Sequence, residues 1–247
     1  KEKCSTTFLT PTMPPQESPH SLNTAPVKPL SPEPDHHMSE PILEAFCQLA
    51  EDEIKRTPTL TSEMNLLLQG LQDVLPEETG KHYTYPVVEK HFKKILGEGS
   101  GLLADIVSLT ADRLSWGVPY AEHVGEPDMD ELRENYAFSP IIGSQKGNRS
   151  EPLPLPLYSS NQIYAGVVLQ GPHINYPSHV HRAAEIYWTV AGHAEWQKGD
   201  EWSHREPGSV LLHEHGVRHA TVTNESPVLM LFAWVTNPES IPVIVRL

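Results

Sequence analysis

Beyond residue 160 the chain is divided into short apolar segments, and this pattern restricts the fold more than any other feature. The segments are rich in β-branched and aromatic residues and are separated by Gly, Pro, Asn or Asp. We expect strands at 163–170, 185–191, 193–197, 209–212, 219–223, 228–235 and 241–245. Many short strands at close spacing are typical of a sandwich or a barrel.

The segment from residue 39 to about 114 has the periodicity of helices instead. One apolar stripe recurs at helical spacing and consists of Met64, Leu67, Leu68, Leu71, Val74 and Leu75. Further helices are expected at 42–54, 88–96 and 102–114, with Pro86 suited to a first turn and Gly97 to a stop. Each stripe needs a partner that covers it, so we expect a helical subdomain that packs against the strands as scaffold.

The remaining segments set the predicted domain organisation. Residues 1–38 are rich in proline and lack a periodic apolar pattern, so we expect a disordered tail or sequence added to the natural protein. Residues 115–160 are rich in Gly, Pro and charge and are expected to form a connection, or a lid or wall, rather than core. The prediction is a tail (1–38), a helical subdomain with its connection (39–150) and a β-barrel with the site (151–247). The fold class is α+β, mainly β.

Composition excludes several classes of partner. The 32 acidic residues outnumber the 18 basic ones, which gives a formal charge of −14 and a surface that repels phosphate backbones and anionic lipid. The longest apolar runs, such as 228–235, are shorter than the roughly 18 residues that a membrane helix needs. We therefore expect no nucleic acid and no membrane as partner. Two cysteines, Cys4 and Cys47, and no secretory signal pattern favour a reducing compartment, the cytoplasm.

Histidine is the unusual residue of this composition. Eight of the 14 histidines lie between His173 and His219. His179, His181, Glu185 and Tyr187 all occupy odd positions, so on one unbulged strand their side chains would share a face. Two imidazoles with a carboxylate suit a divalent transition metal ion, for which zinc, iron, manganese, nickel and cobalt all remain open.

A second motif offers the missing part of such a site. Gly208, Gly216 and His219 have the spacing G-x7-G-x2-H. With the first motif, His179-x-His181-x3-Glu185-x6-Gly192, this spacing resembles the two-motif signature of cupins. The resemblance covers about residues 160 to 245 and implies a double-stranded β-helix, or jelly-roll, barrel. Two positions depart from the signature, since Glu214 stands where proline is common and Thr223 where asparagine is common.

The other histidines of this segment are not tied to the set by spacing. His173, His193 and His204 are expected to lie on the surface or outside the ligand set. His213 and His215 are the strongest exceptions because they lie near His219 in the sequence.

Two tyrosines narrow the resemblance to one family of cupins. The pattern is Tyr176-x2-His179-x-His181-x3-Glu185-x-Tyr187, with His219 34 residues after Glu185. It resembles the dimethylsulfoniopropionate lyase family, whose members also place a helical segment before the barrel. The resemblance implies that His181, Glu185 and His219 hold the metal, with His179 as a ligand or close neighbour.

The same resemblance implies a reaction and a substrate. The substrate would be a small zwitterionic sulfonium carboxylate, and β-elimination would release dimethyl sulfide and acrylate. Tyr187 would be the general base, and Tyr176, with His179, would help to hold the substrate. Aromatic faces attract cations, so Trp188 and Trp234 are candidates for a wall around the sulfonium group, together with Trp196, Trp202 and Tyr164.

Two other functions remain open at this point. Another metal-dependent cupin enzyme, such as an oxygenase or isomerase of a small carboxylate, would share every ligand. A non-catalytic binding cupin would have an intact barrel without turnover. The apolar helical stripes would also suit a homodimer.

Overall fold

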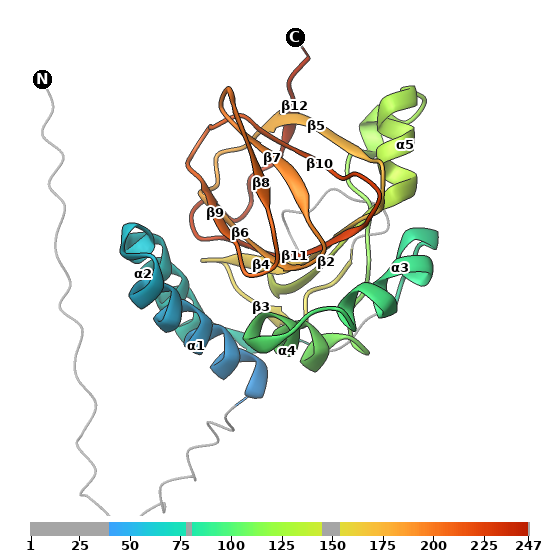
Figure 1. The fold of residues 1–247 in the computed structure, drawn as a ribbon. Coiled ribbons are helices and arrows are strands. Elements are labelled where there is room, and N and C mark those ends of the chain that lie inside the picture. The colour runs from blue at the N-terminus through green and yellow to red at the C-terminus, as the bar shows by residue number, and fades with distance from the viewer. Residues whose placement is uncertain (1–39, 78–80, 145–153, 247) are drawn as a thin grey trace, which may run out of the picture. The chain divides into compact units, whose positions relative to one another are not determined.

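The computed structural model describes residues 40–77, 81–144 and 154–246, in which two β-sheets face each other and helices cover one side (Figure 1). The larger sheet has the strand order β1-β3-β2-β4-β11-β6-β9, and the smaller has the order β12-β5-β10-β7-β8. The fold class expected from the sequence, α+β and mainly β, is confirmed. The tail expected at residues 1–38 lies outside the described residues.

The strands have the following bounds: β1 Leu75–Pro76, β2 Tyr136–Gly143, β3 Tyr158–Ser159, β4 Tyr164–Gln170, β5 Asn175–Val180, β6 Glu185–Ala191, β7 Ala194–Lys198, β8 Glu201–Arg205, β9 Val210–His213, β10 His219–Val222, β11 Val228–Trp234 and β12 Val243–Ile244. All seven strands expected from the sequence are present with small shifts of their ends. Within the segment beyond residue 160, β5 and β8 were not expected. Pro177 and polar neighbours hide β5 from a propensity argument, and Pro177 lies where the pairing of β5 with β10 is irregular.

The helices are α1 Pro41–Arg56, α2 Thr61–Gly70, α3 Pro86–Leu96, α4 Gly101–Thr110 and α5 Pro127–Asn135, with short 3₁₀ turns η1 Pro58–Leu60, η2 Leu71–Asp73 and η3 Ala121–His123. Proline occupies the first turn of α3, as expected. The expected helix over 64–75 is too long, because α2 ends at Gly70. A Cβ at Gly70 would lie 2.3 Å from Ile163 Cγ2, so the close approach to the barrel requires glycine. Val74 and Leu75 therefore lie outside the helix.

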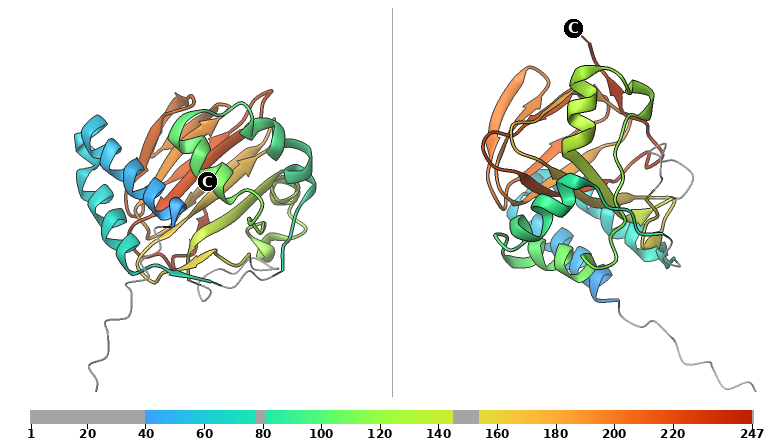
Figure 2. Two further views of the ribbon diagram at one scale, coloured as in Figure 1. Left: turned by 90° about the horizontal axis from the view of Figure 1, so that it is seen from below. Right: turned by 90° about the vertical axis from the view of Figure 1, so that its right-hand side faces the viewer.

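Alternation along the strands divides the apolar residues between two cores. On β6, Ile186, Trp188 and Val190 pack with the helices, whereas Tyr187 faces the space between the two sheets. On β11 the even-numbered side chains, such as Phe232, face the space between the sheets, and the odd-numbered ones pack with the helices. The larger sheet is therefore buried on both faces, with helices outside and the smaller sheet opposite, as the two views of Figure 2 show.

Trp188 lies on the outer face of the larger sheet, not in the barrel. Its side chain is fully buried, and its indole Nε1 lies 3.3 Å from Oε2 of Glu53 on α1. The expectation that Trp188 lines a substrate site is wrong. The physical reason is the alternation itself, since Tyr187 and Trp188 are neighbours on one strand and point to opposite faces.

Residues 115–160 hold more structure than the sequence indicated. The expectation of a connection without core is wrong, because α5 and β2 lie within it and β2 is a buried strand between β3 and β4. Ser139 and Pro140 lower the strand signal, and the pairing with β4 is irregular just after Pro140. The barrel sheet therefore begins before residue 151.

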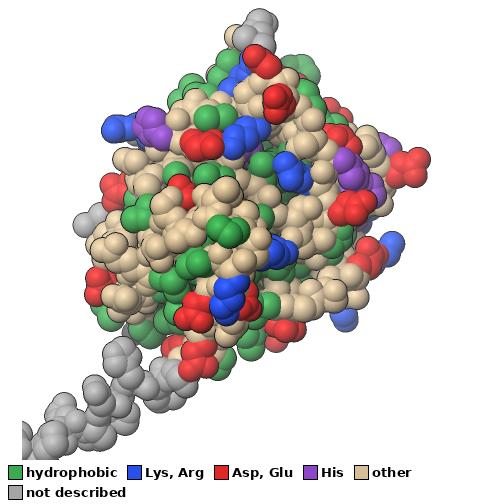
Figure 3. Space-filling view, turned by 60° about the vertical axis from the view of Figure 1, so that its left-hand side comes forward, with side chains coloured by type: hydrophobic (Ala, Val, Ile, Leu, Met, Phe, Trp, Pro, Cys, Tyr) green, Lys and Arg blue, Asp and Glu red, His purple; other side chains and the backbone are tan. Residues whose placement is uncertain are grey.

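Within the described ranges, no helix combines the length and apolar character that crossing a membrane requires. On the face that Figure 3 shows, acidic and basic side chains are interspersed.

The Glu53 carboxylate joins α1 to the barrel, and its removal should destabilise the fold. It is 1% exposed and binds Arg56 Nη2 at 2.5 Å and Thr57 Oγ1 at 2.5 Å besides the indole of Trp188. Glu53→Ala leaves the buried indole N–H without its acceptor, so we expect the free energy of unfolding to fall by about 2 kcal/mol in urea denaturation. Glu51→Ala, an exposed site on the same helix, should change it by less than about 0.5 kcal/mol. Equal effects of the two changes would contradict the role of Glu53.

Candidate metal and substrate site

The site residues expected from the first motif come from two sheets and the turn between them. His179 lies on β5 of the smaller sheet, His181 follows the end of β5, and Glu185 and Tyr187 lie on β6 of the larger sheet. The expectation of one continuous strand is therefore wrong, although the four side chains do meet inside the barrel. The chain crosses between the sheets at 181–184, and this crossing brings them together.

Cross-strand pairing completes the cluster. His219 on β10 is the register partner of His179 on β5. Glu185 is the register partner of both Trp234 on β11 and His213 on β9. Two sets of paired side chains thus face each other across the barrel interior.

The three imidazoles are oriented by the backbone. Nδ1 of His179 lies 2.9 Å from the Pro177 carbonyl oxygen, Nδ1 of His219 lies 2.8 Å from that of Val217, and Nδ1 of His181 lies 3.1 Å from that of Ala183. A histidine whose Nδ1–H donates to a carbonyl presents a neutral Nε2 as a metal ligand. The hydrogen bonds therefore fix the tautomer that a metal site needs.

Glu185 is a buried carboxylate with its partners in place. Its Oε2 lies 2.8 Å from Nε2 of His181 and 3.3 Å from Nε2 of His219, and its Oε1 accepts a 2.6 Å hydrogen bond from the indole of Trp234. Burial alone would raise the pKa of Glu185, but His181 and His219 outweigh it and hold that pKa well below its usual range. The carboxylate is therefore ionised. Burial lowers the pKa of His179, which favours its neutral form.

The donor set fits a divalent transition metal ion. Ligand atoms of His179, His181 and His219 lie within 4.8 Å of one another, and so do those of Glu185, His213 and His219. Imidazoles with one carboxylate suit zinc, iron, manganese, nickel or cobalt. Among the described residues, Nε2 of His219 lies 3.3 Å from Oε2 of Glu185, and the two atoms do not meet the geometry of a hydrogen bond, which agrees with two ligand atoms that point to a common ion.

A cavity of about 110 Å³ opens beside this cluster and has many aromatic residues in its wall. His179, His181 and Glu185 line it where it meets the cluster. The aromatic part consists of Tyr120, Tyr136, Phe138, Tyr164, Tyr176, Tyr187, Phe232 and Trp234. A small molecule in this cavity would thus contact the ligand cluster and several ring faces together.

Four tyrosines of the cavity wall have raised pKa values. Burial, followed by the charge of Glu185, raises the pKa of Tyr187 well above its usual value. Burial also raises the pKa values of Tyr176, Tyr120 and Tyr136. The hydroxyls of Tyr120 and Tyr176 share a 2.8 Å hydrogen bond, and the Tyr176 ring stacks on His179 with centroids 4.2 Å apart. Tyr176 is thereby fixed against the ligand cluster.

The aromatic wall differs in part from the expected one. Trp234 and Tyr164 line the cavity, as the sequence suggested, whereas Trp188 and Trp202 do not, since Trp202 is half exposed at 50%. Trp196 is buried behind the cavity, with its ring 4.6 Å from that of Tyr187.

Tyr120 and Tyr136 were missed because they lie within 115–160. That segment was expected to form a connection, or a lid or wall, and part of it does form a wall of the cavity. Tyr120 has φ 62°, a left-handed conformation that no sequence pattern announces. Tyr136 and Phe138 alternate on β2, which is a signal that could have been noticed.

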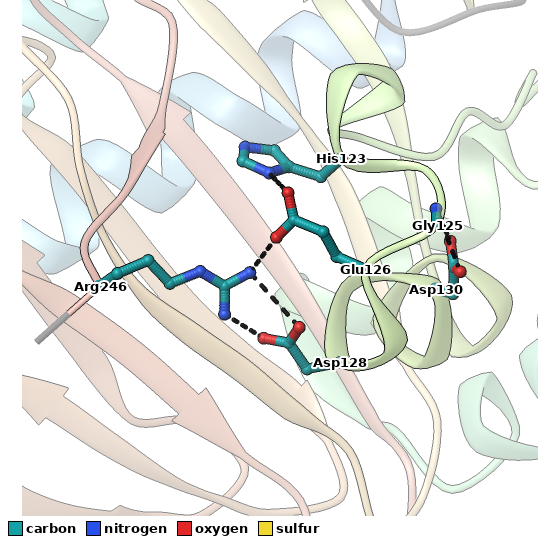
Figure 4. Close-up of polar contacts among 6 residues, drawn as sticks. All are labelled: His123, Gly125, Glu126, Asp128, Asp130 and Arg246. Atoms are coloured by element: carbon teal, nitrogen blue, oxygen red, sulfur yellow. Dashed lines mark hydrogen bonds and ion pairs between the residues drawn. The ribbon is translucent and has the colours of Figure 1, made fainter.

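An ion-pair cluster joins two segments that contribute to the cavity wall. One is the turn that holds Tyr120 and Glu122, and the other is 238–242 near the C-terminus. Beyond the latter, Arg246 contacts Glu126 at 2.5 Å and Asp128, and Glu126 contacts Nδ1 of His123 at 2.8 Å (Figure 4). Hydrogen bonds from His123 and Arg246 lower the pKa of Glu126, so these carboxylates stay charged at neutral pH.

Comparison with known proteins identifies similar chains. The family model described as dimethylsulfoniopropionate lyase matches residues 61–230. The dimethylsulfoniopropionate lyase DddQ of Ruegeria pomeroyi is 35% identical over 88 residues, which are 35% of this chain and 44% of that protein. The sequence match thus spans less than half the length of this curated relative.

Solved structures extend the similarity over the fold. The crystal structure of DddQ from Ruegeria pomeroyi superposes with a TM-score of 0.60 at 21% identity, covering 84% of this chain and 98% of the other. A crystal structure from work on the dimethylsulfoniopropionate lyases RdDddP and RnDddQII superposes with a TM-score of 0.63 at 20% identity. The match covers 83% of this chain and 98% of the other. At this identity the superpositions show a shared fold.

Loss of the Arg246 guanidinium should loosen the C-terminal wall of the cavity. The ion pairs of Arg246 are half exposed, so Arg246→Gln should change the melting temperature little. Hydrogen–deuterium exchange should become several-fold faster over 238–246 and 121–130, because the only charged link described between these segments is removed. Arg205→Gln on β8 is the control and should leave both segments unchanged. Unaltered exchange in Arg246→Gln would show that the ion pairs do not hold the wall.

Proposed function

This chain belongs to the dimethylsulfoniopropionate lyase family, and we propose that it cleaves dimethylsulfoniopropionate into dimethyl sulfide and acrylate with the help of one divalent transition metal ion. The observation that carries the proposal is the shared cavity. A buried His/Glu cluster, a buried tyrosine two residues along the same strand and an aromatic wall all border one small space. These are the groups that a carboxylate, an acidic carbon–hydrogen bond and a sulfonium group require.

The carboxylate end of the substrate belongs at the ligand cluster. His179, His181, Glu185 and His219 would hold the metal, which when bound supplies a Lewis acid for the carboxylate and so makes the adjacent C–H bond more acidic. Tyr176 would position the substrate, since its ring is fixed by the stack on His179 and its hydroxyl by Tyr120. Tyr120 thus acts through Tyr176.

Tyr187 is the proposed general base. Its side chain lines the cavity, and without a cation in the site its pKa is raised by burial and by Glu185. A divalent cation beside it would favour the phenolate. The phenolate oxygen would then take the α-proton, the electron pair of that C–H bond would form the C=C bond of acrylate, and the C–S bond would break towards sulfur. Dimethyl sulfide leaves neutral, and the proton on Tyr187 returns to solvent.

The sulfonium end suits the aromatic wall. Trp234, Phe232 and Tyr164 lie near one another, with ring centroids 5.4–6.5 Å apart. Ring faces attract a cation, more strongly where water is excluded. The positive charge disappears when dimethyl sulfide forms, so this wall would bind the substrate better than either product.

Tyr187→Phe tests the base. The change removes one oxygen from a buried ring, so the fold should persist while dimethyl sulfide release falls by at least about 100-fold, the usual contribution of a general base. The assay is headspace gas chromatography of purified, metal-loaded protein given dimethylsulfoniopropionate under anaerobic conditions. Metal content is measured in the same samples.

The control is Tyr83→Phe, outside the barrel, which should keep full activity. Equal release from Tyr187→Phe and wild type would remove Tyr187 from the role of base. No release from folded, metal-loaded wild type would refute the proposed substrate. Activity that needs dioxygen would favour an oxygenase.

Two tryptophans on opposite faces of the larger sheet test the wall. Trp234→Phe removes a cavity ring and the indole donor to Glu185, so we expect kcat/KM to fall by at least about tenfold, the effect of losing one or two contacts of this kind. Trp188→Phe should lower the melting temperature with kcat/KM nearly unchanged, because that ring contacts α1 instead. A larger loss of kcat/KM in Trp188→Phe would contradict this assignment.

The cytoplasmic location and the homodimer expected from the sequence stay predictions.

A further inference from the structure

Exposure divides the residues that line the cavity into a deep group and a rim. The ligands of the cluster are buried in the deep group, whereas lining residues that are exposed or half-buried form the rim. Apart from Glu122, the described rim consists of prolines, two serines, Phe138 and Ile241. Glu122 is exposed and is the one carboxylate at this opening among the described residues.

The carboxylate of Glu122 is not paired within the described part of the chain. Its side chain makes no hydrogen bond or ion pair with another described residue, and the neighbouring His123 and Arg246 bind Glu126 instead (Figure 4). Burial is the main cause that raises the pKa of Tyr120, and the charge of Glu122 is one of the smaller causes. The field of Glu122 therefore reaches the wall of the cavity.

The rest of the cavity offers nothing that offsets this charge. No lysine or arginine is among the described residues that line it. The other lining carboxylate, Glu185, is engaged by His181 and by the indole of Trp234. A cleft with one sign of charge and apolar walls attracts ligands of the opposite sign, because such walls screen the field less than water does. A ligand whose carboxylate meets the buried cluster extends towards the rim, so Glu122 acts on its other end.

We propose that Glu122 is a specificity-determining residue, which selects carboxylate ligands that carry a fixed positive charge at the end away from the metal site. The inference rests on the proposed function for the placement of the substrate carboxylate, and it adds the residue that distinguishes a sulfonium group from a neutral group. The same charge repels acrylate, which has no positive end, so it also favours release of that product.

Two ligands of the same shape test this role without turnover. 3-(Trimethylammonio)propionate carries a fixed positive charge, whereas 4,4-dimethylpentanoate has carbon in place of nitrogen and a neutral end. Their dissociation constants for metal-loaded wild type and Glu122→Gln are measured by isothermal titration calorimetry at low ionic strength. We expect wild type to prefer the cationic ligand and Glu122→Gln to lose about fivefold of that preference, the effect of one partly solvated charge. A general loosening of the cavity would weaken both ligands and leave their ratio unchanged.

Glu239→Gln is the matched control. Glu239 is an exposed carboxylate between the rim residues Pro238 and Ser240 but does not line the cavity, so its removal should change the ratio by less than about twofold. An unchanged ratio in Glu122→Gln, or an equal change in Glu239→Gln, would overturn the inference. Wild type without a preference for the cationic ligand would overturn it as well. A shifted ratio without any dimethyl sulfide release would refute the proposed reaction and leave the role of Glu122 standing.

Discussion

The buried charge of Glu185 is the constraint on which the site depends. An ionised carboxylate at 2% exposure is costly unless its oxygens are fully engaged. Its Oε1 meets the indole of Trp234, and its Oε2 lies between His181 and His219. Each of these partners is delivered by a different part of the barrel, so the carboxylate holds β11, β10 and the crossing between the sheets in one arrangement.

The larger sheet can carry this charge because it is buried on both faces. The helices take the outer side chains of β6, including Trp188, and Glu53 satisfies the one polar atom of that indole. The inner face is then free to hold polar and aromatic side chains. In the described structure, helices α1 to α5 contribute no residue to the cavity, yet they allow the inner face to be specialised, because the outer face supplies apolar burial.

The sequence predicted the parts of this arrangement that depend on local chemistry. Short β-branched segments predicted the strands, and the spacing of His179, His181, Glu185 and His219 selected residues that meet in the barrel. It did not predict how they meet, because the crossing at 181–184 is a tertiary feature and alternation along one strand was assumed across it. Strict alternation along β6 would have excluded Trp188 from the cavity wall, because Trp188 follows Tyr187 directly and so points to the opposite face of the sheet. Tyr120 and Tyr136 come from a polar, proline-containing segment whose burial is decided by the barrel.

Ring stacking gives the ligand cluster its remaining order. Tyr176 lies against His179 with planes at 6°, and His213 lies against His219 with planes at 17°. The imidazoles of His179 and His219 are 4.0 Å apart, so the four rings form a connected group that begins at the cavity and ends behind the cluster. A side chain held by packing and by a backbone hydrogen bond loses little freedom when it binds an ion. Because Tyr176 also lines the cavity, a shift of its ring there would disturb His179 directly.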